Sequence, residues 1–134
     1  MISKKEIQHL LNDLESDRVE RTISTDKMDK FGEAICSFAN DLPDHQQPGY
    51  LIIGADDKTG KVMPIDISDR LLQKIASIRT EGNIQPQPSM VVEKVELDDG
   101  RVLVAEVQPA HFPPVRYKGN ICVRVGPRRG VANP

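Results

Sequence analysis

The stretch from Phe31 to Gly54, FGEAICSFANDLPDHQQPGYLIIG, decides the fold. Together with Met28, which lies just before this stretch, Phe31, Ile35 and Phe38 form an apolar stripe. Their spacing is that of one face of a helix with 3.6 residues per turn. This spacing predicts a helix over residues 26–40. After a polar loop, the apolar run 50–53 is short enough for a strand, and such continuous runs usually lie inside a sheet covered on both faces. A helix leading into a central strand is therefore the expected centre of the fold.

The rest of the chain predicts two more helices and several strands. Ser3 and Ser68 are N-cap residues for expected helices over residues 4–14 and about 69–78. Ser24 or Thr25 is expected to cap the central helix, and Asn40 to cap its end. Strands are expected at residues 19–23, 50–53, 61–63, 90–97, 101–107 and 121–125. We therefore predict an α/β (α+β) fold, with a mixed β-sheet and about three packed helices.

Two turns complete the predicted topology. Asp98-Asp99-Gly100 between two alternating segments is a β-hairpin signal. Gly126–Gly130, with two arginines, is expected to form a basic loop after the last strand. The chain of 134 residues is expected to be one domain, 1–134. Its abrupt end suggests the amino-terminal module of a longer protein, whose carboxyl-terminal domains follow.

Composition excludes several classes of protein. Cys36 and Cys122 lie far apart in apolar segments, which indicates buried thiols in a reducing compartment and not a disulfide framework. No zinc-type Cys/His spacing and no Walker A sequence occurs. The amino terminus is too polar for a signal peptide, and no stretch reaches the ~20 apolar residues of a membrane span. We expect a cytoplasmic protein without membrane contact.

The charge is distributed unevenly along the chain, although the net charge is only −2. Residues 1–99 contain 12 Lys/Arg and 19 Asp/Glu, whereas residues 100–134 contain six basic residues and one acid, Glu106. This asymmetry predicts an acidic region and a basic patch, provided that the two segments do not intermix in the fold. Segment 111–134 contains no acid at all.

Five segments, in this order and spacing, resemble one known family: Glu15 to Glu20, Ala34–Asn40, Gly49–Asp57, Val115–Tyr117 and Val123–Gly126. Over about residues 14–129 the sequence is similar to the Schlafen/AlbA-like domain. That family is described as DNA-binding in bacterial transcriptional regulators and in proteins formerly called divergent AAA-type ATPases. The resemblance implies a mixed α/β fold and a role related to nucleic acid.

The resemblance also implies an alternative, catalytic function. Animal Schlafen domains cleave structured RNA with acidic residues and a divalent metal, and the matching catalytic and metal-binding residues here are Glu15, Glu20 and Asp57, or its neighbour Asp56. Mg²⁺ or Mn²⁺ would polarise the phosphate and activate water. The sequence departs from the family where Arg21-Thr22 follows the second glutamate in place of the usual lysine. The alternative interpretation is that these acids have no catalytic role and belong to a helix end, a strand surface and a turn.

The residues expected to contact nucleic acid are Arg116, Tyr117, Lys118, Arg124, Arg128 and Arg129. Lysine and arginine displace counterions from phosphates, and a tyrosine can stack on a base. Arg18 and Arg21 can instead pair with nearby acids. Because one small patch neutralises few phosphates, we expect homodimerisation to strengthen binding.

Three functions therefore remain open from the sequence. The first is a nucleic-acid-binding domain, for DNA or RNA, of a bacterial transcriptional regulator, with no cofactor. The second is a Schlafen-type endoribonuclease that uses Mg²⁺ or Mn²⁺. The third is an interaction or oligomerisation module without nucleic acid, which exposed apolar edge strands and paired arginines would favour.

Overall fold

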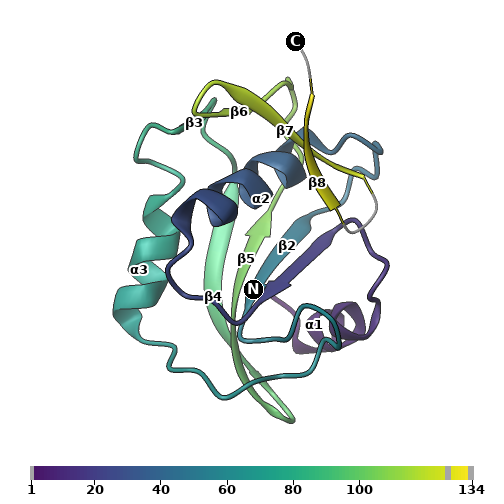
Figure 1. Ribbon diagram of the computed structural model, residues 1–134, viewed down its shortest axis with the longest axis vertical. Helices are drawn as coiled ribbons and strands as arrows, with labels where there is room; N and C mark the ends of the chain where they lie inside the picture. Colours follow the sequence, from purple (N-terminus) through teal and green to yellow (C-terminus); the bar gives the residue numbers. More distant parts are fainter. Residues whose placement is uncertain (1, 126–127, 133–134) are drawn as a thin grey trace.

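The computed structural model describes residues 2–125 and 128–132, without the side chains of Val125, Arg128 and Arg129. In this part of the chain the helices are α1 (Lys4–Asn12), α2 (Met28–Asn40) and α3 (Asp69–Ser77). The strands are β1 (Val19–Thr22), β2 (Gly49–Ile53), β3 (Ile84–Gln85), β4 (Met90–Leu97), β5 (Gly100–Val107), β6 (Arg116–Tyr117), β7 (Asn120–Val125) and β8 (Arg128–Ala132). The predicted class, α/β with three helices, is confirmed (Figure 1). None of these described helices is long and apolar enough to cross a membrane.

The first sheet has the strand order β1-β2-β5-β4. Strands β1 and β2 are parallel, whereas the β2–β5 and β5–β4 pairs are antiparallel, so the sheet is mixed as predicted. Along β2, Tyr50 and Ile52 join the apolar cluster of α1, and Leu51 and Ile53 join that of α2 and α3. Helices therefore cover both faces, which explains why every residue of β2 is buried.

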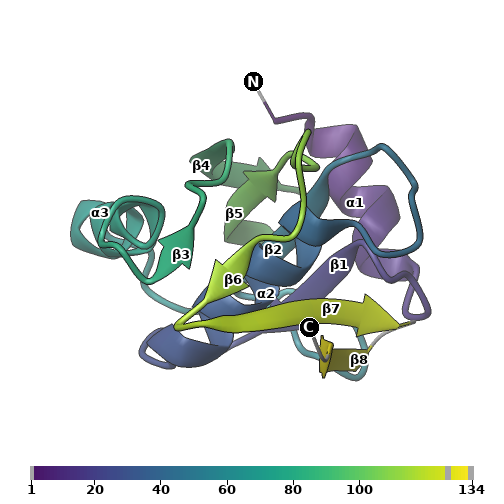
Figure 2. The ribbon, with the colours of Figure 1, turned by 90° about the horizontal axis from the view of Figure 1, so that it is seen from above.

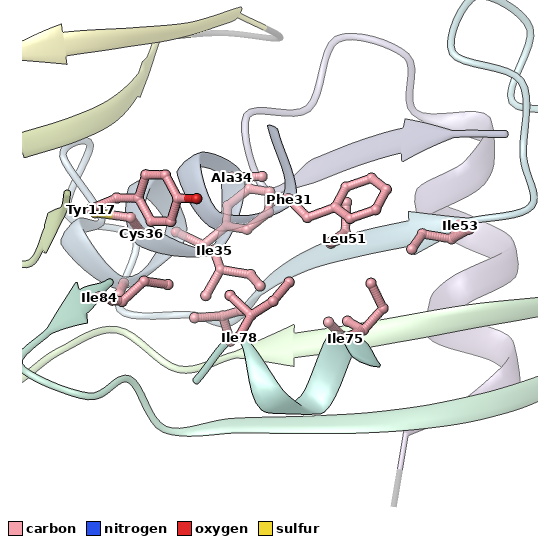
Figure 3. Packing of buried hydrophobic residues seen from close by; sticks show 14 of the residues in the cluster. Phe31, Ala34, Ile35, Cys36, Leu51, Ile53, Ile75, Ile78, Ile84 and Tyr117 are labelled. Carbon is pink, nitrogen blue, oxygen red and sulfur yellow. The ribbon is translucent and has the colours of Figure 1, made fainter. Parts of the chain in front are cut away.

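Helix α2 packs between two sheets. On one side, Phe31 and Ile35 contact the apolar cluster that includes Leu51 of β2 and Ile78 after α3 (Figure 3). On the other side, α2 packs against β7. Eight of its 13 residues are buried, more than a single-faced amphipathic helix requires. The stripe predicted from the sequence is core, as expected, and the small residues beside it bury the second face.

The carboxyl-terminal strands form a second sheet and do not extend the first. Its order is β3-β6-β7-β8, all antiparallel, and α2 separates it from the first sheet (Figure 2). The sequence predicted a single sheet and a basic loop over residues 126–130. Instead, Arg128–Ala132 pairs with β7, while residues 126 and 127 lie outside the described part. The expected strand 61–63 is reduced to an isolated bridge between Ala55 and Val62.

The helix starts were predicted correctly for α1 and α3. Ser3 and Ser68 each accept a hydrogen bond from a backbone N–H in the first turn of their helix. For α2 the prediction was wrong, because the N-cap position belongs to Lys27, whose side chain makes no cap hydrogen bond. Ser24 instead stabilises the preceding turn, where its hydroxyl donates to the carboxylate two residues further on. The helix consequently begins at Met28.

Two strand glycines provide a matched test of the packing between α2 and β2. A Cβ added to Gly49 would collide with the ring of Phe38, whereas a Cβ added to Gly130 would meet no atom within 4 Å. We expect Gly49→Ala to lower the free energy of unfolding by about 1–3 kcal/mol, because the overpacked ring has to shift. Gly130→Ala should change it by less than about 0.5 kcal/mol. Urea unfolding monitored by circular dichroism measures both, and equal stabilities would contradict this packing.

Candidate nucleic-acid interface

Arg124 joins the carboxyl-terminal sheet to the first sheet. Its side chain is buried, with Nη1 2.7 Å from Glu20 Oε1 and Nη2 2.7 Å from the Val19 carbonyl oxygen, to both of which it donates. The guanidinium carbon also lies 5.4 Å from the ring centroid of Phe38. The prediction that Arg124 contacts nucleic acid is not supported, because its position in β7 turns the side chain inward onto β1. Its charge stabilises the junction between the sheets instead.

Asn40 holds the same junction from the end of α2. Its Nδ2 donates to the carbonyl oxygens of Val115 (2.9 Å) and Cys122 (2.7 Å), and its Oδ1 accepts from the Val115 N–H (2.6 Å). The sequence predicted that Asn40 caps the helix. The C-cap is instead Asp41, in the left-handed conformation with φ 45°, and the Asn40 amide satisfies backbone groups of the second sheet.

Tyr117 is also part of the core. Its ring is 5% exposed, and its hydroxyl donates to Asp29 Oδ1 (2.6 Å), which also accepts from Lys118 Nζ (2.8 Å). Lys118 and Tyr117 hold the pKa of Asp29 below its usual value, while burial and the bond to Asp29 raise the pKa of Tyr117. The predicted stacking of a base on Tyr117 is not supported, because the ring packs against α2. Lys118 stays at the surface as an ion-paired cation.

The other predicted contact residues lie around β7 and β8. Arg116 is half-buried and donates to the Gly119 carbonyl oxygen at 3.3 Å. The backbone register places Arg129 opposite Arg124 and Arg128 opposite Val125. The side chains of Arg128 and Arg129 lie outside the described part of the structure. Because β8 is the last strand in the order of the second sheet, these two arginines stand on an edge strand.

An open cleft of about 580 Å³, here called the β8 cleft, lies beside this edge strand. Four parts of the chain contribute its lining: β1, the polar side of α2, the turn after β2, and the β7–β8 hairpin. The lining residues are Glu20, Arg21, Thr22, Lys30, Glu33, Asp57, Cys122, Arg124, Gly130 and Val131. The cleft therefore combines cations and carboxylates from segments that are far apart in the sequence.

The predicted catalytic carboxylates are only partly brought together. Glu20 and Asp57 line the β8 cleft, whereas Glu15 is exposed and does not belong to its lining. Glu20 is engaged by Arg124. Among the described residues, no group of three or more His, Cys, Asp or Glu side chains is placed to hold a metal ion. The structure therefore brings together two of the three carboxylates that the family resemblance implies for Mg²⁺ or Mn²⁺.

Asp56, the alternative to Asp57, has a structural role. Its Oδ1 accepts hydrogen bonds from the backbone N–H groups of Lys58 and Thr59, both at 2.9 Å. These hydrogen bonds hold the pKa of Asp56 below its usual value, and the bond from Thr59 has the largest effect. Asp56 therefore has the structural role that the alternative interpretation of the sequence predicted, because its carboxylate stabilises the turn.

Arg21 adds a buried cation to the wall of the β8 cleft. Nη1 and Nη2 donate long hydrogen bonds to the carbonyl oxygens of Asp13 (3.4 Å) and Leu14 (3.5 Å), and Nε has no partner among the described residues. Burial lowers the pKa of Arg21, Asp57 opposes this effect and Arg124 adds to it. The acid that interacts with Arg21 is thus Asp57, whose carboxylate acts through its charge and not through a hydrogen bond.

Sequence analysis missed Lys30 and Glu33 as cleft residues. Both lie on the polar side of α2, three residues apart, and so face the same direction. That spacing was the available signal, but on its own it describes any solvated helix face.

A second cleft, of about 890 Å³, has a different chemical character. It is formed by the loops around residues 41–46, 86–89 and 108–113, and includes Asp41, Asp44 and the highly exposed Phe112. None of the residues that line it is a lysine or arginine. Of these two clefts, the β8 cleft is therefore the one whose described lining contains lysine and arginine.

Removing the buried guanidinium should be costly. We expect Arg124→Ala to lower the free energy of unfolding by about 3–5 kcal/mol, because it breaks an ion pair between two largely buried side chains. Lys118→Ala is the matched control, since its ion pair with Asp29 is exposed and should contribute little. Urea unfolding of the two variants measures the difference, and a small effect of Arg124→Ala would show that the junction does not depend on it.

Asn40 and Asn12 allow a second matched comparison, because each is the last residue of its helix. Asn40→Ala should cost about 2–3 kcal/mol, since it leaves backbone groups of Val115 and Cys122 unsatisfied. The Asn12 side chain bonds only within its own exposed turn, to Gln8, so Asn12→Ala should change stability by less than about 0.5 kcal/mol. Thermal and urea denaturation test both, and similar losses would contradict a specific role of Asn40.

Comparison with solved structures identifies the same fold elsewhere. The DIP2311 protein from Corynebacterium diphtheriae is 22% identical, with a TM-score of 0.58, over 87% of this chain. This chain spans only 22% of that protein's length. The N-terminal domain of an ATP-dependent DNA helicase RecG-related protein from Nitrosomonas europaea is 26% identical, with a TM-score of 0.59, and the match covers 82% of this chain and 75% of that domain.

A search among curated proteins found no match. A family model described as "Schlafen, AlbA_2" matches residues 15–133, which includes every element from β1 to β8. The resemblance noted in the sequence is thereby confirmed: the chain belongs to the Schlafen AlbA_2 family.

Proposed function

We propose that this domain binds nucleic acid along the β7–β8 hairpin and the adjoining β8 cleft, as a module of a bacterial transcriptional regulator. The observation that carries the proposal is the placement of the acid-free segment 111–134, most of whose described part forms a two-stranded ribbon at the edge of the fold (Figure 1). The ribbon borders a cleft to which β1 and α2 contribute further cations.

Charge and shape both favour a nucleic-acid ligand. Arg128 and Arg129 stand on the edge strand, and the exposed Lys30 lies on the cleft wall. Lysine and arginine gain affinity by releasing counterions from phosphates. A two-stranded β-ribbon also has the dimensions that the major groove of B-form DNA admits. The carboxylates of the cleft limit how closely a phosphate can approach its centre, so the ribbon is the primary contact.

The relatives support this assignment without extending it. The solved domain from Nitrosomonas europaea comes from a protein named for its relation to a DNA helicase. We further propose that other domains follow this module in the same protein, and that pairing of two copies raises its affinity through avidity. The choice between DNA and RNA is left to the binding experiment.

The experiment compares the wild type with two double variants that each remove two positive charges. Arg128→Ala/Arg129→Ala removes the cations of the edge strand and leaves the buried Arg124 in place. Lys94→Ala/Arg101→Ala is the control, because both residues are exposed on the β4–β5 hairpin, at the opposite end of the molecule in Figure 1. Fluorescence anisotropy with duplex DNA, single-stranded DNA and structured RNA gives affinity as a function of salt.

We expect the β8 variant to weaken binding and to reduce the slope of log K against log[salt] by about 2 for duplex DNA, because two phosphate contacts are lost. The control variant should bind like the wild type. Equal losses in both variants would mean a non-specific charge effect. If no probe binds the wild type at low salt, the proposal fails for this domain, and the exposed Val131 on the paired edge strand would favour a protein partner instead.

The nuclease alternative is tested in the same samples. It rests on the presence of Glu20 and Asp57 in one cleft. Incubating structured RNA with Mn²⁺ or with EDTA shows whether metal-dependent cleavage occurs. Asp57→Asn is the informative variant, because Asp57 is exposed whereas Glu20 is tied to Arg124 and its replacement would also destabilise the fold. Cleavage that requires Mn²⁺ and is lost in Asp57→Asn would replace simple binding as the function; RNA that stays intact supports binding alone.

A further inference from the structure

The two cysteines of the chain meet where α2 packs against β7. Cys36 lies on α2 and Cys122 on β7, both belong to the same apolar cluster, and neither is in a disulfide. They are 86 positions apart in the sequence numbering, and the sequence alone gave no reason to pair them. Figure 3 shows Cys36 on the side of α2 that faces the second sheet, beside Tyr117. The fold has therefore brought together the only thiols that the protein contains.

Asn40 connects the thiol of Cys36 with the backbone of Cys122. Hydrogen bonding by Cys122 holds the pKa of the Cys36 thiol below its usual value, although burial opposes this effect. The Asn40 amide contacts Cys36 Sγ at 3.8 Å and the Cys122 carbonyl oxygen at 2.7 Å. Cys36 Sγ in turn donates to the Val115 carbonyl oxygen at 3.2 Å. The Cys122 thiol donates to the Asn120 carbonyl oxygen at 3.9 Å, so the two cysteines are held on either side of the Asn40 amide.

The β8 cleft gives a reactant a route to this pair. Cys122 belongs to the lining of the cleft but is only 2% exposed, and Cys36 is fully buried. Lys30 and Arg21 in the same lining attract an anionic reactant, whereas Glu20, Glu33 and Asp57 limit how closely it approaches. In this arrangement Cys122 is placed to act as the attacking cysteine and Cys36 as the resolving cysteine.

We propose that Cys36 and Cys122 form a redox-active dithiol, which a low-molecular-weight disulfide such as oxidised glutathione converts into an intramolecular disulfide between α2 and β7. The Cys122 thiolate attacks the S–S bond of the reactant and releases the first small thiol. The Cys36 thiolate then attacks Cys122 Sγ and releases the second. In total one S–S bond breaks and one forms, the two cysteines are oxidised, and their two hydrogens end on the two released thiols.

The disulfide would lock the carboxyl-terminal hairpin onto α2. In the reduced protein this attachment depends on Arg124, Asn40 and apolar packing. A covalent bond that closes such a long loop restricts the unfolded chain strongly and should stabilise the folded state if the native geometry accepts it. Oxidation therefore makes the hairpin more rigid, whatever ligand the hairpin binds.

The test measures the disulfide in the whole chain against a glutathione redox buffer. Native protein and protein in concentrated urea are equilibrated over a range of reduced to oxidised glutathione ratios, quenched with acid, and analysed by mass spectrometry after tryptic digestion. The expected product joins the peptides that contain Cys36 and Cys122. The effective concentration of the two thiols should be at least about tenfold higher in the native protein than in urea, because the fold holds them together.

Single variants show whether the two residues act as a pair. Cys36→Ala should accumulate a mixed disulfide of Cys122 with glutathione, which the wild type resolves, and Cys122→Ala should leave Cys36 reduced because it has no contact with solvent. Circular dichroism of the reduced variants establishes that each is folded, and the oxidised wild type should unfold at a higher temperature than the reduced one. Two reduced thiols in the native wild type at all ratios, a mixed disulfide as its final product, or equal effective concentrations in buffer and urea would each overturn the proposal.

Discussion

The fold depends on the burial of α2 between two sheets. One sheet cannot cover a helix that has eight buried residues in 13, and the second sheet supplies the missing contacts. This constraint explains the small residues Gly32, Ala34 and Ala39 beside the aromatic stripe, because they let strands approach the helix from both sides. Between β5 and β6 the chain contacts the end of α2, where the Ala110 N–H donates to the Ala39 carbonyl oxygen at 2.8 Å.

Polar contacts then fix the second sheet in one position on α2. Arg124 reaches across to Glu20 and the backbone of β1, and Asn40 satisfies backbone groups of Val115 and Cys122. Apolar packing alone tolerates sliding, whereas a buried charge pair and a three-bond amide specify a single register. The basic carboxyl-terminal segment thus divides into two parts. Tyr117 and Arg124 anchor it, and Arg128 and Arg129 lie on the edge strand of the second sheet.

The sequence predicted those elements whose residue pattern is complete within a short segment of the chain. The stripe of α2, the buried run of β2, the caps Ser3 and Ser68 and the Asp98-Asp99-Gly100 hairpin carry their signals within a few residues, and the structure contains all of them. Strand β8 was mistaken for a loop because Gly130 and two arginines give no alternation. The two-residue strands β3 and β6 are too short to have a pattern at all.

The site was less predictable because its residues acquire their roles from distant partners. In the sequence Arg124 has the pattern of a surface cation. Its buried position depends on a partner in another sheet, Glu20, which the sequence does not place beside it. Asn40 looked like a helix cap, although its partners lie 75 and 82 positions further along the chain. The family resemblance supplied Glu20 and Asp57, which do share a cleft, but also Glu15, which does not belong to it. Composition showed that the carboxyl-terminal segment is rich in cations, but it could not show that Lys118 and Arg124 pair with acids of the earlier segment.

An NMR titration of the ¹⁵N-labelled domain with the nucleic acid that binds most tightly tests the central claim most directly. Amide shifts should change along β7 and β8, at Lys30 and in the turn at Asp57, and stay constant around the acidic cleft at residues 41–46 and 108–113. Changes confined to that second cleft, or to the β4–β5 hairpin, would contradict the assignment of the β8 side as the surface that contacts nucleic acid.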